Sequence, residues 1–270
     1  MTKRQLGLEQ AVRAGRRGKG VTAEVAAVKR ALGRPKKKPT WGGERAGAGR
    51  KPKVENQGAE GVEKATVKHR ARPFLDPKHP VHVTLRVTRE VGRLRRRTAY
   101  DAFRRAMAKT LARTDFRVVH VSIQANHVHL ICEADDRIAL AKGVRGLSIS
   151  AAHRLNTAIG EERGTKRRCG RVFTDRYHAR IIDSPRHARN ELAYVLNNWR
   201  HHREDLAGPR QRRAKVDPYS SGVAFPGWAG VEGWFAWPPG YEPLPVSWPR
   251  TWLLTTGWRR WGEIGLREVP

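Results

Sequence analysis

The feature that most constrains the fold is a pair of apolar runs, "FRVVHVSI" at 116–123 and "HVHLICEA" at 127–134, separated by "QAN". Runs of this length, rich in β-branched residues, are typical of buried strands. Asn126 suits the tight turn of a short connection. The sequence therefore predicts a β-hairpin.

The flanking segments predict the other elements of one α+β domain. "VHVTLRV" at 81–87 alternates apolar and polar residues and predicts a half-buried strand, and a fourth strand is predicted at 171–183. Helices are predicted at 98–114, 139–160 and 185–205. The order β-α-β-β-α-β-α predicts a ferredoxin-like split βαβ core, an antiparallel sheet with helices on one face and a free face on the other.

Composition divides the chain into three regions, with this core at 73–207. Residues 1–72 hold 20 Lys and Arg against 6 Asp and Glu and little to bury, which predicts a disordered basic arm. The arm is interpreted as a tether for phosphates or as a solubilising tail. Residues 208–270 hold seven of the nine Trp. We expect this extension to wrap over the core, with base stacking on single-stranded DNA as the alternative.

Charge and cysteine content narrow the class of protein. A net charge of +30 favours nucleic acid as the partner. No apolar run approaches the length of a membrane span, and the basic N-terminal stretch does not resemble a signal peptide, so no membrane partner is expected. Cys132 and Cys169 give no disulfide framework. We expect a cytoplasmic protein that is nucleoid-associated when bound to DNA.

His127 and His129 are the first candidate site residues. Side chains at i and i+2 of a strand point to the same face, so the two imidazoles project side by side. Neutral imidazoles in such an arrangement suit a divalent metal. The motif alone is common by chance, and a functional site requires a third ligand and a reactive partner.

The 185–205 helix supplies both. It is expected to begin with Ser184 as its N-cap and Pro185 as its first residue. Tyr194 and Asn198 stand one turn apart, away from the apolar stripe. That stripe consists of Leu192, Val195, Leu196 and Trp199. Tyr194 is therefore expected to face a substrate, whereas Tyr100 and Tyr177 are expected in the core.

A His127, His129 and Asn198 set is mixed nitrogen and oxygen ligation, which permits Mg²⁺ or Mn²⁺ but not a closed structural zinc site. A tyrosine hydroxyl with a free pKa of about 10 needs such a neighbour to become a nucleophile. The hypothesis is that Tyr194 attacks a DNA phosphate and forms a covalent phosphotyrosine.

Other site residues are predicted from charge and position. His120 lies near the histidine pair and is expected opposite Val119 and Val121, as an auxiliary group or as a satisfied strand histidine. His178, His201 and His202 are weaker candidates. Phosphate contacts are predicted for a set of basic residues, with a solvated surface as the alternative. They are Arg93, Arg95, Arg96, Arg97, Arg104, Arg105, Lys166, Arg167 and Arg168.

"ANHVHLICEAD", followed about 65 residues later by "ELAYVLNNWRHH", resembles the single-tyrosine HUH transposases of insertion sequences, and the REP-associated tyrosine transposases in particular. The resemblance covers roughly residues 72–205. His127 and His129 match the HUH pair, Tyr194 the nucleophile and Asn198 the third ligand. It implies Mg²⁺- or Mn²⁺-dependent cleavage and rejoining of single-stranded DNA near hairpins through a 5′-phosphotyrosine. The resemblance permits either a homodimer or a monomer, because insertion-sequence members act as dimers and REP-associated members as monomers.

Two other functions remain alternatives. One is a catalytically silent DNA-binding protein derived from a transposase. The other is a two-histidine phosphoesterase, with "HVTL" at His82 and "HVHL" at His127 as its motifs. The second motif has His129 where Thr or Ser is required, and this function leaves Tyr194 and Asn198 without a role.

Overall fold

The computed structural model describes residues 73–231, 235 and 240–269. From residue 73 onward they belong to one compact unit. The arm predicted at 1–72 lies outside the described residues. No helix of the described part is long and apolar enough to cross a membrane.

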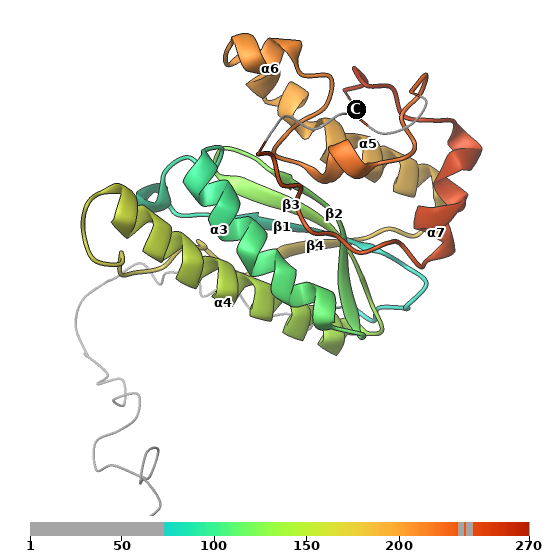
Figure 1. Cartoon of the computed structure of the whole chain (residues 1–270). Helices are drawn as coiled ribbons and strands as arrows, with labels where there is room; N and C mark the ends of the chain where they lie inside the picture. Colours follow the sequence, from blue (N-terminus) through green and yellow to red (C-terminus); the bar gives the residue numbers. More distant parts are fainter. Residues whose placement is uncertain (1–72, 232–234, 236–239, 270) are drawn as a thin grey trace, which may run out of the picture. The chain divides into compact units, whose positions relative to one another are not determined.

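Four antiparallel strands form the sheet, and the predicted α+β architecture is confirmed. They are β1 (Val81–Arg86), β2 (Phe116–Ile123), β3 (His127–Ala134) and β4 (His178–Ile181), in the order β2-β3-β1-β4 (Figure 1). The hairpin between β2 and β3 closes where Gln124 N donates to the carbonyl of His127 at 2.9 Å. Both hairpin strands begin and end at the predicted residues.

One face of the sheet packs against α3 (Arg97–Ala108) and α4 (Arg137–Glu162) in an apolar core (Figure 1). Val83, Leu85 and Leu130 point into this core and are fully buried. Gly143 is required where α4 crosses β2, since a Cβ there would lie 2.2 Å from the Phe116 ring. A side chain at this position would hold the helix away from the sheet.

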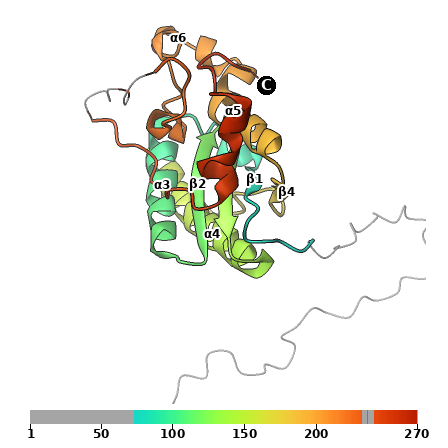
Figure 2. The same ribbon diagram turned by 90° about the vertical axis from the view of Figure 1, so that its right-hand side faces the viewer.

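The other face is covered by α5 (Pro185–His201), which corrects the expected free face (Figures 1 and 2). Ser184 caps α5 by accepting from His187 N, and Pro185 is its first residue, as predicted. Leu192, Val195 and Leu196 are buried against Val119 and Ile131. The expectation failed because α5 also has an apolar stripe that must be buried. Since α3 and α4 already cover one face of the sheet, α5 packs on the other.

Short helices complete the unit. They are η1 (Arg89–Val91), η2 (Lys109–Ala112), η3 (Glu204–Leu206), α6 (Pro209–Arg213), η4 (Ser221–Ala224), α7 (Trp252–Thr255) and η5 (Gly257–Trp261). The second helix was predicted to continue to residue 114 with Leu111 in its apolar stripe. It tightens into η2 instead, which rotates Leu111 outward and leaves it 48% exposed.

Two further boundaries differ from prediction. The strand predicted at 171–183 is ordered as a strand only at His178–Ile181. The helix predicted to reach residue 205 ends at His201, because Arg203 adopts a left-handed conformation with φ of 55°. Tyr100 is buried in the core as predicted, whereas Tyr177 is only half-buried against it.

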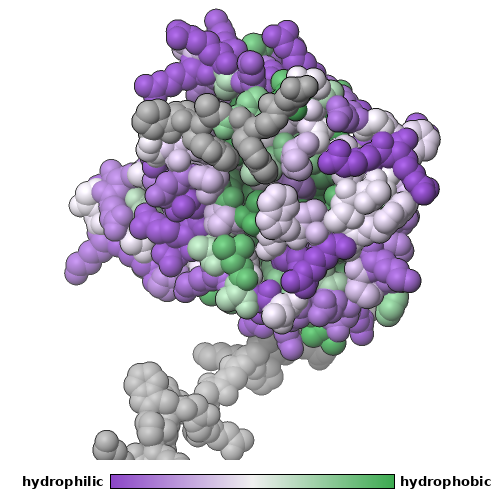
Figure 3. Space-filling view, turned by 45° about the vertical axis from the view of Figure 1, so that its right-hand side comes forward, coloured by the Kyte–Doolittle hydropathy of each residue, from purple (hydrophilic) through white to green (hydrophobic). Residues whose placement is uncertain are grey.

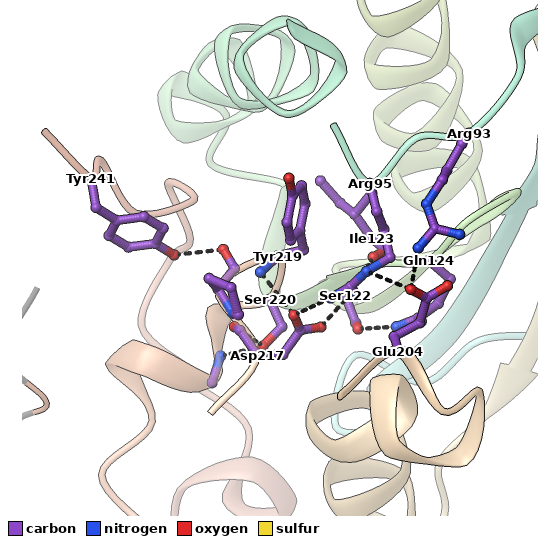
Figure 4. Close-up of polar contacts among 12 residues, drawn as sticks. Arg93, Arg95, Ser122, Ile123, Gln124, Glu204, Asp217, Tyr219, Ser220 and Tyr241 are labelled. Atoms are coloured by element: carbon purple, nitrogen blue, oxygen red, sulfur yellow. Dashed lines mark hydrogen bonds and ion pairs between the residues drawn. The ribbon is translucent and has the colours of Figure 1, made fainter. Parts of the chain in front are cut away.

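The described part of the extension wraps over α5. Trp228 and Trp258 are buried, and their indole N–H groups donate to the carbonyls of Gly222 and Leu254 at 2.8 and 3.1 Å. At the other end of this segment, Asp217 accepts a double hydrogen bond from buried Arg95 (Figure 4). In these residues the extension therefore packs against the core.

Residues 262–268 contact the outer side of α5. Asn197 Nδ2 donates to the carbonyl of Gly265 and Arg200 Nε to that of Leu266, each at 3.0 Å. Arg189 pairs with Glu268, with Nη2 and Oε2 2.9 Å apart. Side chains that alternate with the apolar stripe thus tie α5 to this segment.

Candidate active site

The two histidines of β3 project toward α5, on the face opposite the apolar core. Their ring centroids are 4.6 Å apart at an interplanar angle of 89°. His129 is buried, whereas His127, at the start of the strand, is half-buried. The expected side-by-side arrangement is present.

The helix α5 brings Tyr194 and Asn198 to the same place. The ring centroid of Tyr194 lies 5.3 Å from that of His129 and 5.9 Å from that of His82. Asn198, one turn further along, is buried at 1% exposure. This burial was not expected from its position on the polar side of the helix.

Among the residues that the structure describes, several buried polar atoms of this cluster have no hydrogen-bond partner. They are Nε2 of His129 and both Oδ1 and Nδ2 of Asn198. An unsatisfied buried polar atom destabilises a fold by about 1–3 kcal/mol, so such atoms mark places where another group binds.

The predicted metal site requires the Asn198 amide as a ligand in addition to the two histidines. Among the described residues, no group of three or more His, Cys, Asp or Glu side chains is arranged to hold a metal ion. His127, His129 and Asn198 offer two imidazole nitrogens and one amide oxygen, and His127 is oriented by a 2.7 Å hydrogen bond from Nδ1 to Asn126 Oδ1. This set suits an ion that completes its coordination with substrate oxygens.

A hydrogen-bonded chain behind His129 fixes its orientation. Glu191 Oε2 lies 2.7 Å from Nδ1 of His82, and Nε2 of His82 lies 2.9 Å from Nδ1 of His129. A proton on each Nδ1 satisfies the whole chain and leaves Nε2 of His129 as a bare lone pair. The sequence did not predict this role for His82 or Glu191, although His82 alternates outward on β1 beside the histidine pair.

Burial keeps His127 and His129 neutral. It lowers the pKa of His129 to about 2, with His82 and His127 adding to the effect, and that of His127 to about 4, with His202 and Arg86 adding to it. Burial alone would raise the pKa of Glu191, but its hydrogen bond and charge interaction with His82 hold that pKa below the ordinary value. The imidazoles therefore keep their lone pairs at neutral pH and the carboxylate stays ionised.

The weaker histidine candidates separate into two groups. His202 lies 5.2 Å from His127 and His201 lies 6.3 Å from Tyr194, measured between ring centroids, so both stand at the rim of the site. His178 is exposed on β4. His120 contacts Ser221 and Phe225 of the extension. The bulge at 118–120 also puts it on the same face as Val119, which corrects the expected alternation.

Arg95 is a structural cation, which corrects its predicted phosphate contact. Its side chain is buried, pairs with Asp217 and donates to the carbonyl of Ile123 at 2.9 Å (Figure 4). The prediction failed because a run of arginines does not reveal which one meets a carboxylate distant in sequence.

The other predicted phosphate ligands lie nearer the surface. Several have carboxylate partners: Arg93 with Glu204, Arg96 with Glu162, Arg97 with Asp101 and Arg104 with Glu242. Arg168 donates to Asn156 Oδ1 at 2.7 Å, whereas Arg105, Lys166 and Arg167 have exposed or half-exposed side chains. Their contacts with phosphate stay predictions.

A basic groove opens at the His127 end of the site. It has a volume of about 660 Å³. Arg86, Arg89, Arg93 and Asn126 line it, and Asn126 is the residue that orients His127. Arg86 and Arg89 were not among the predicted phosphate ligands, although Arg86 ends the first strand and Arg89 follows it in an arginine-rich stretch. The groove is suited to a polyanion approaching the histidine pair.

The geometry disfavours a two-histidine phosphoesterase. Both ring nitrogens of His82 are engaged, Nδ1 by Glu191 and Nε2 by His129. His82 therefore has no free nitrogen with which to act as a general acid or base on a substrate.

Comparisons with known proteins find a similar family model and similar solved structures. The family model described as "Transposase IS200 like" matches residues 77–198. A solved structure described as "Structure of the REP associates tyrosine transposase bound to a REP hairpin" is 16% identical, with a TM-score of 0.39, over 49% of this chain and 73% of that one. No protein with a curated description matches the sequence.

Proposed function

We propose, from the premise that residues 77–198 form a transposase domain of the IS200-like family, that this protein cuts and rejoins single strands of DNA through Tyr194. The observation that carries the proposal is the position of Tyr194. Its ring stands against His129 and His82, one turn from an amide that has no partner. A nucleophile, candidate metal ligands and their orienting groups thus meet in one cluster.

In the proposed step, the Tyr194 hydroxyl loses its proton and its oxygen bonds to a DNA phosphorus. The bond from phosphorus to the 3′ oxygen breaks, and that oxygen takes up a proton and leaves as a 3′-hydroxyl. The 5′ side stays on the protein as a phosphotyrosine. Attack by a 3′-hydroxyl reverses the step and joins strands, so no oxidant or nucleotide is consumed.

His127, His129 and Asn198 would hold the Mg²⁺ or Mn²⁺ ion. When bound, such an ion would act as a Lewis acid and stabilise the negative charge that develops on the phosphate oxygens. The chain contributes the rest: Glu191 and His82 orient His129, and Asn126 orients His127. The packing of α5 on the sheet limits the water around Tyr194.

We place the single-stranded substrate along the basic groove beside His127. Arg86 and Arg89 line this groove without carboxylate partners among the described residues, so they remain available to phosphate oxygens. A strand lying there passes the histidine pair before it reaches Tyr194. The resemblance to single-tyrosine HUH transposases implies that this strand lies next to a DNA hairpin.

The test is covalent trapping. The full-length protein is incubated with fluorescent single-stranded DNA carrying a hairpin from its own genomic flanks, with Mg²⁺ or Mn²⁺, and the products are separated under denaturing conditions. We expect a protein–DNA adduct that needs the metal and is absent for Tyr194→Phe.

Two outcomes would contradict the proposal. An adduct that persists in Tyr194→Phe removes the nucleophile assignment. A wild-type protein that binds the DNA but yields no adduct, while an active relative does so in parallel, supports the catalytically silent DNA-binding protein instead.

A further inference from the structure

The extension presents three tryptophans to solvent. Trp248, Trp252 and Trp261 are 72%, 48% and 53% exposed, whereas Trp228 and Trp258 are buried. Within α7, the aliphatic Leu253 and Leu254 point inward. Wrapping over the core therefore accounts for the two buried tryptophans, whereas about half or more of each of the other three remains exposed.

Arginines stand over these rings. Arg260 lies over Trp252 with 4.9 Å from its Cζ atom to the ring centroid, and Arg186 of α5 lies over Trp261 at 5.2 Å. Arg259 lies over the buried Trp258 at 4.7 Å. In the part of the chain that the structure describes, none of these arginines forms an ion pair with a carboxylate. Their charges are therefore free for another anion.

A pocket of about 610 Å³ continues the same surface. Trp248, Trp258 and Phe225 contribute aromatic walls, and Arg259 is among the lining residues. Figure 3, with the α7 side of the molecule turned forward, shows pale and green surface interrupted by purple hydrophilic side chains. Proline and aliphatic side chains such as Pro245, Val246 and Leu254 line much of the rest of the pocket, while the exposed rings of Trp252 and Trp261 lie next to arginines.

We infer that this Arg–Trp surface, defined by Arg186, Trp248, Trp252, Arg259, Arg260 and Trp261, binds single-stranded DNA. Its bases would stack on the exposed rings while its phosphates meet the arginines. Duplex DNA fits poorly, because its base faces are covered by their neighbours. The choice of DNA over RNA rests on the proposed function.

The surface would position the strand that Tyr194 cuts. Arg186 precedes Tyr194 by eight residues on α5, about 12 Å along the helix axis. A tract held on the Arg–Trp surface is therefore anchored to the same rigid helix as the nucleophile. This gives the extension a role in retaining the cut strand.

The test measures equilibrium binding without chemistry. Full-length Tyr194→Phe protein is titrated in EDTA against a fluorescent oligothymidylate of about 20 nucleotides, an abasic strand of equal charge and a blunt DNA hairpin. Trp252→Ala with Trp261→Ala is compared with Leu111→Ala with Ile149→Ala, which removes exposed apolar side chains from the α3 and α4 side.

We expect the tryptophan pair to weaken oligothymidylate binding by about tenfold or more, and abasic binding by less than about twofold. The Leu111 and Ile149 control should change neither. Arg259→Gln with Arg260→Gln should weaken both strands and lower the salt dependence. Melting curves check that each variant is folded, and the arginine pair alone tests the surface if Trp252→Ala unfolds the protein.

Equal affinity of the tryptophan variant and its parent for oligothymidylate would overturn the inference, as would a loss of hairpin binding in that variant as large as its loss of oligothymidylate binding. Dimers that these substitutions dissociate, seen by light scattering, would assign the surface to a second copy of the chain instead. Because the assay contains neither Tyr194 nor metal, its failure is distinct from a failure of covalent trapping.

Discussion

The two faces of one sheet have opposite chemistry, although the same strands supply both. On β1 and β3, Val83 and Leu130 point toward α3 and α4 into an apolar core. The alternating residues His82 and His129 point toward α5 and form a buried hydrogen-bonded cluster. The face toward α3 and α4 stabilises the fold. The face toward α5 places the unsatisfied Nε2 atom of His129 next to Tyr194.

The difference shows how a small domain carries a strained site. Burying polar atoms without partners destabilises a protein, and a well-packed apolar layer on the reverse side offsets that cost. Because alternate residues of a strand serve opposite faces, a change on one face leaves the other intact. Stability and activity should therefore be separable by mutation.

The largest expected effect is the loss of the covalent adduct in Tyr194→Phe, with little change in stability, because the hydroxyl forms no hydrogen bond with the other described residues. The matched change on the opposite face is Tyr100→Phe, which removes a 2.8 Å hydrogen bond to the carbonyl of Glu242. It should keep the adduct and lower the free energy of unfolding by about 1 kcal/mol. Gel trapping and urea unfolding measure the two effects. If Tyr100→Phe abolishes the adduct, the faces are not independent.

Glu191→Gln should slow adduct formation by roughly 10- to 100-fold and weaken Mn²⁺ binding by a similar factor, because His82 loses the carboxylate that orients it. Mn²⁺ titration by calorimetry gives a readout besides activity. Asp183→Asn is the control, since Asp183 contacts His187 at the exposed start of the same helix. Unchanged Mn²⁺ affinity in Glu191→Gln would show that the chain of hydrogen bonds does not orient His129.

On the apolar face, Gly143→Ala should lower the free energy of unfolding by about 1–3 kcal/mol, since the new Cβ overlaps the buried Phe116 ring. Gly146→Ala, on the same helix with open space around it, should raise stability by up to about 1 kcal/mol. Urea denaturation distinguishes the two. Equal effects would mean that α4 moves freely over the sheet.

The last expected effect is a pH dependence of stability on the α5 face. Burial lowers the pKa of His120 from 6.5 to about 4. Between these values the unfolded chain binds a proton that the folded chain does not, so His120 lowers stability as the pH falls from 6.5 to 4. The slope is on the order of 1 kcal/mol per pH unit.

Urea unfolding at several pH values tests this. His120→Asn should flatten the slope, while Ser221→Ala, which removes the hydroxyl next to the His120 ring, should keep it. Parallel curves for wild type and His120→Asn would exclude His120 as the source.

The local sequence was sufficient to predict the strands and helix faces that form the buried core. The β2–β3 hairpin, the start of α5 and its buried stripe of Leu192, Val195 and Leu196 follow from periodicity and turn chemistry. The short β4 and the exposed Leu111 did not, because both depend on where the chain turns after the element rather than on its pattern.

For the site, the sequence named Tyr194, Asn198 and the histidine pair, and the structure brings them together. It could not name the pairing of His82 with Glu191, since the two residues are 109 positions apart and meet only through packing of α5 on β1. Arg95 is the reverse case, a residue that looked available for DNA until Asp217 was placed beside it.

The contacts of residues 265–268 with α5 set an order of events in synthesis. Helix α5 is complete at residue 201, but the partners of Asn197, Arg200 and Arg189 are added only up to residue 268. At ribosomal rates of about 5–20 residues per second, those 67 positions take roughly 3 to 13 s. During that interval the nascent chain carries its nucleophile on a helix that is not yet fastened. Full assembly of the site therefore waits until the extension has been made.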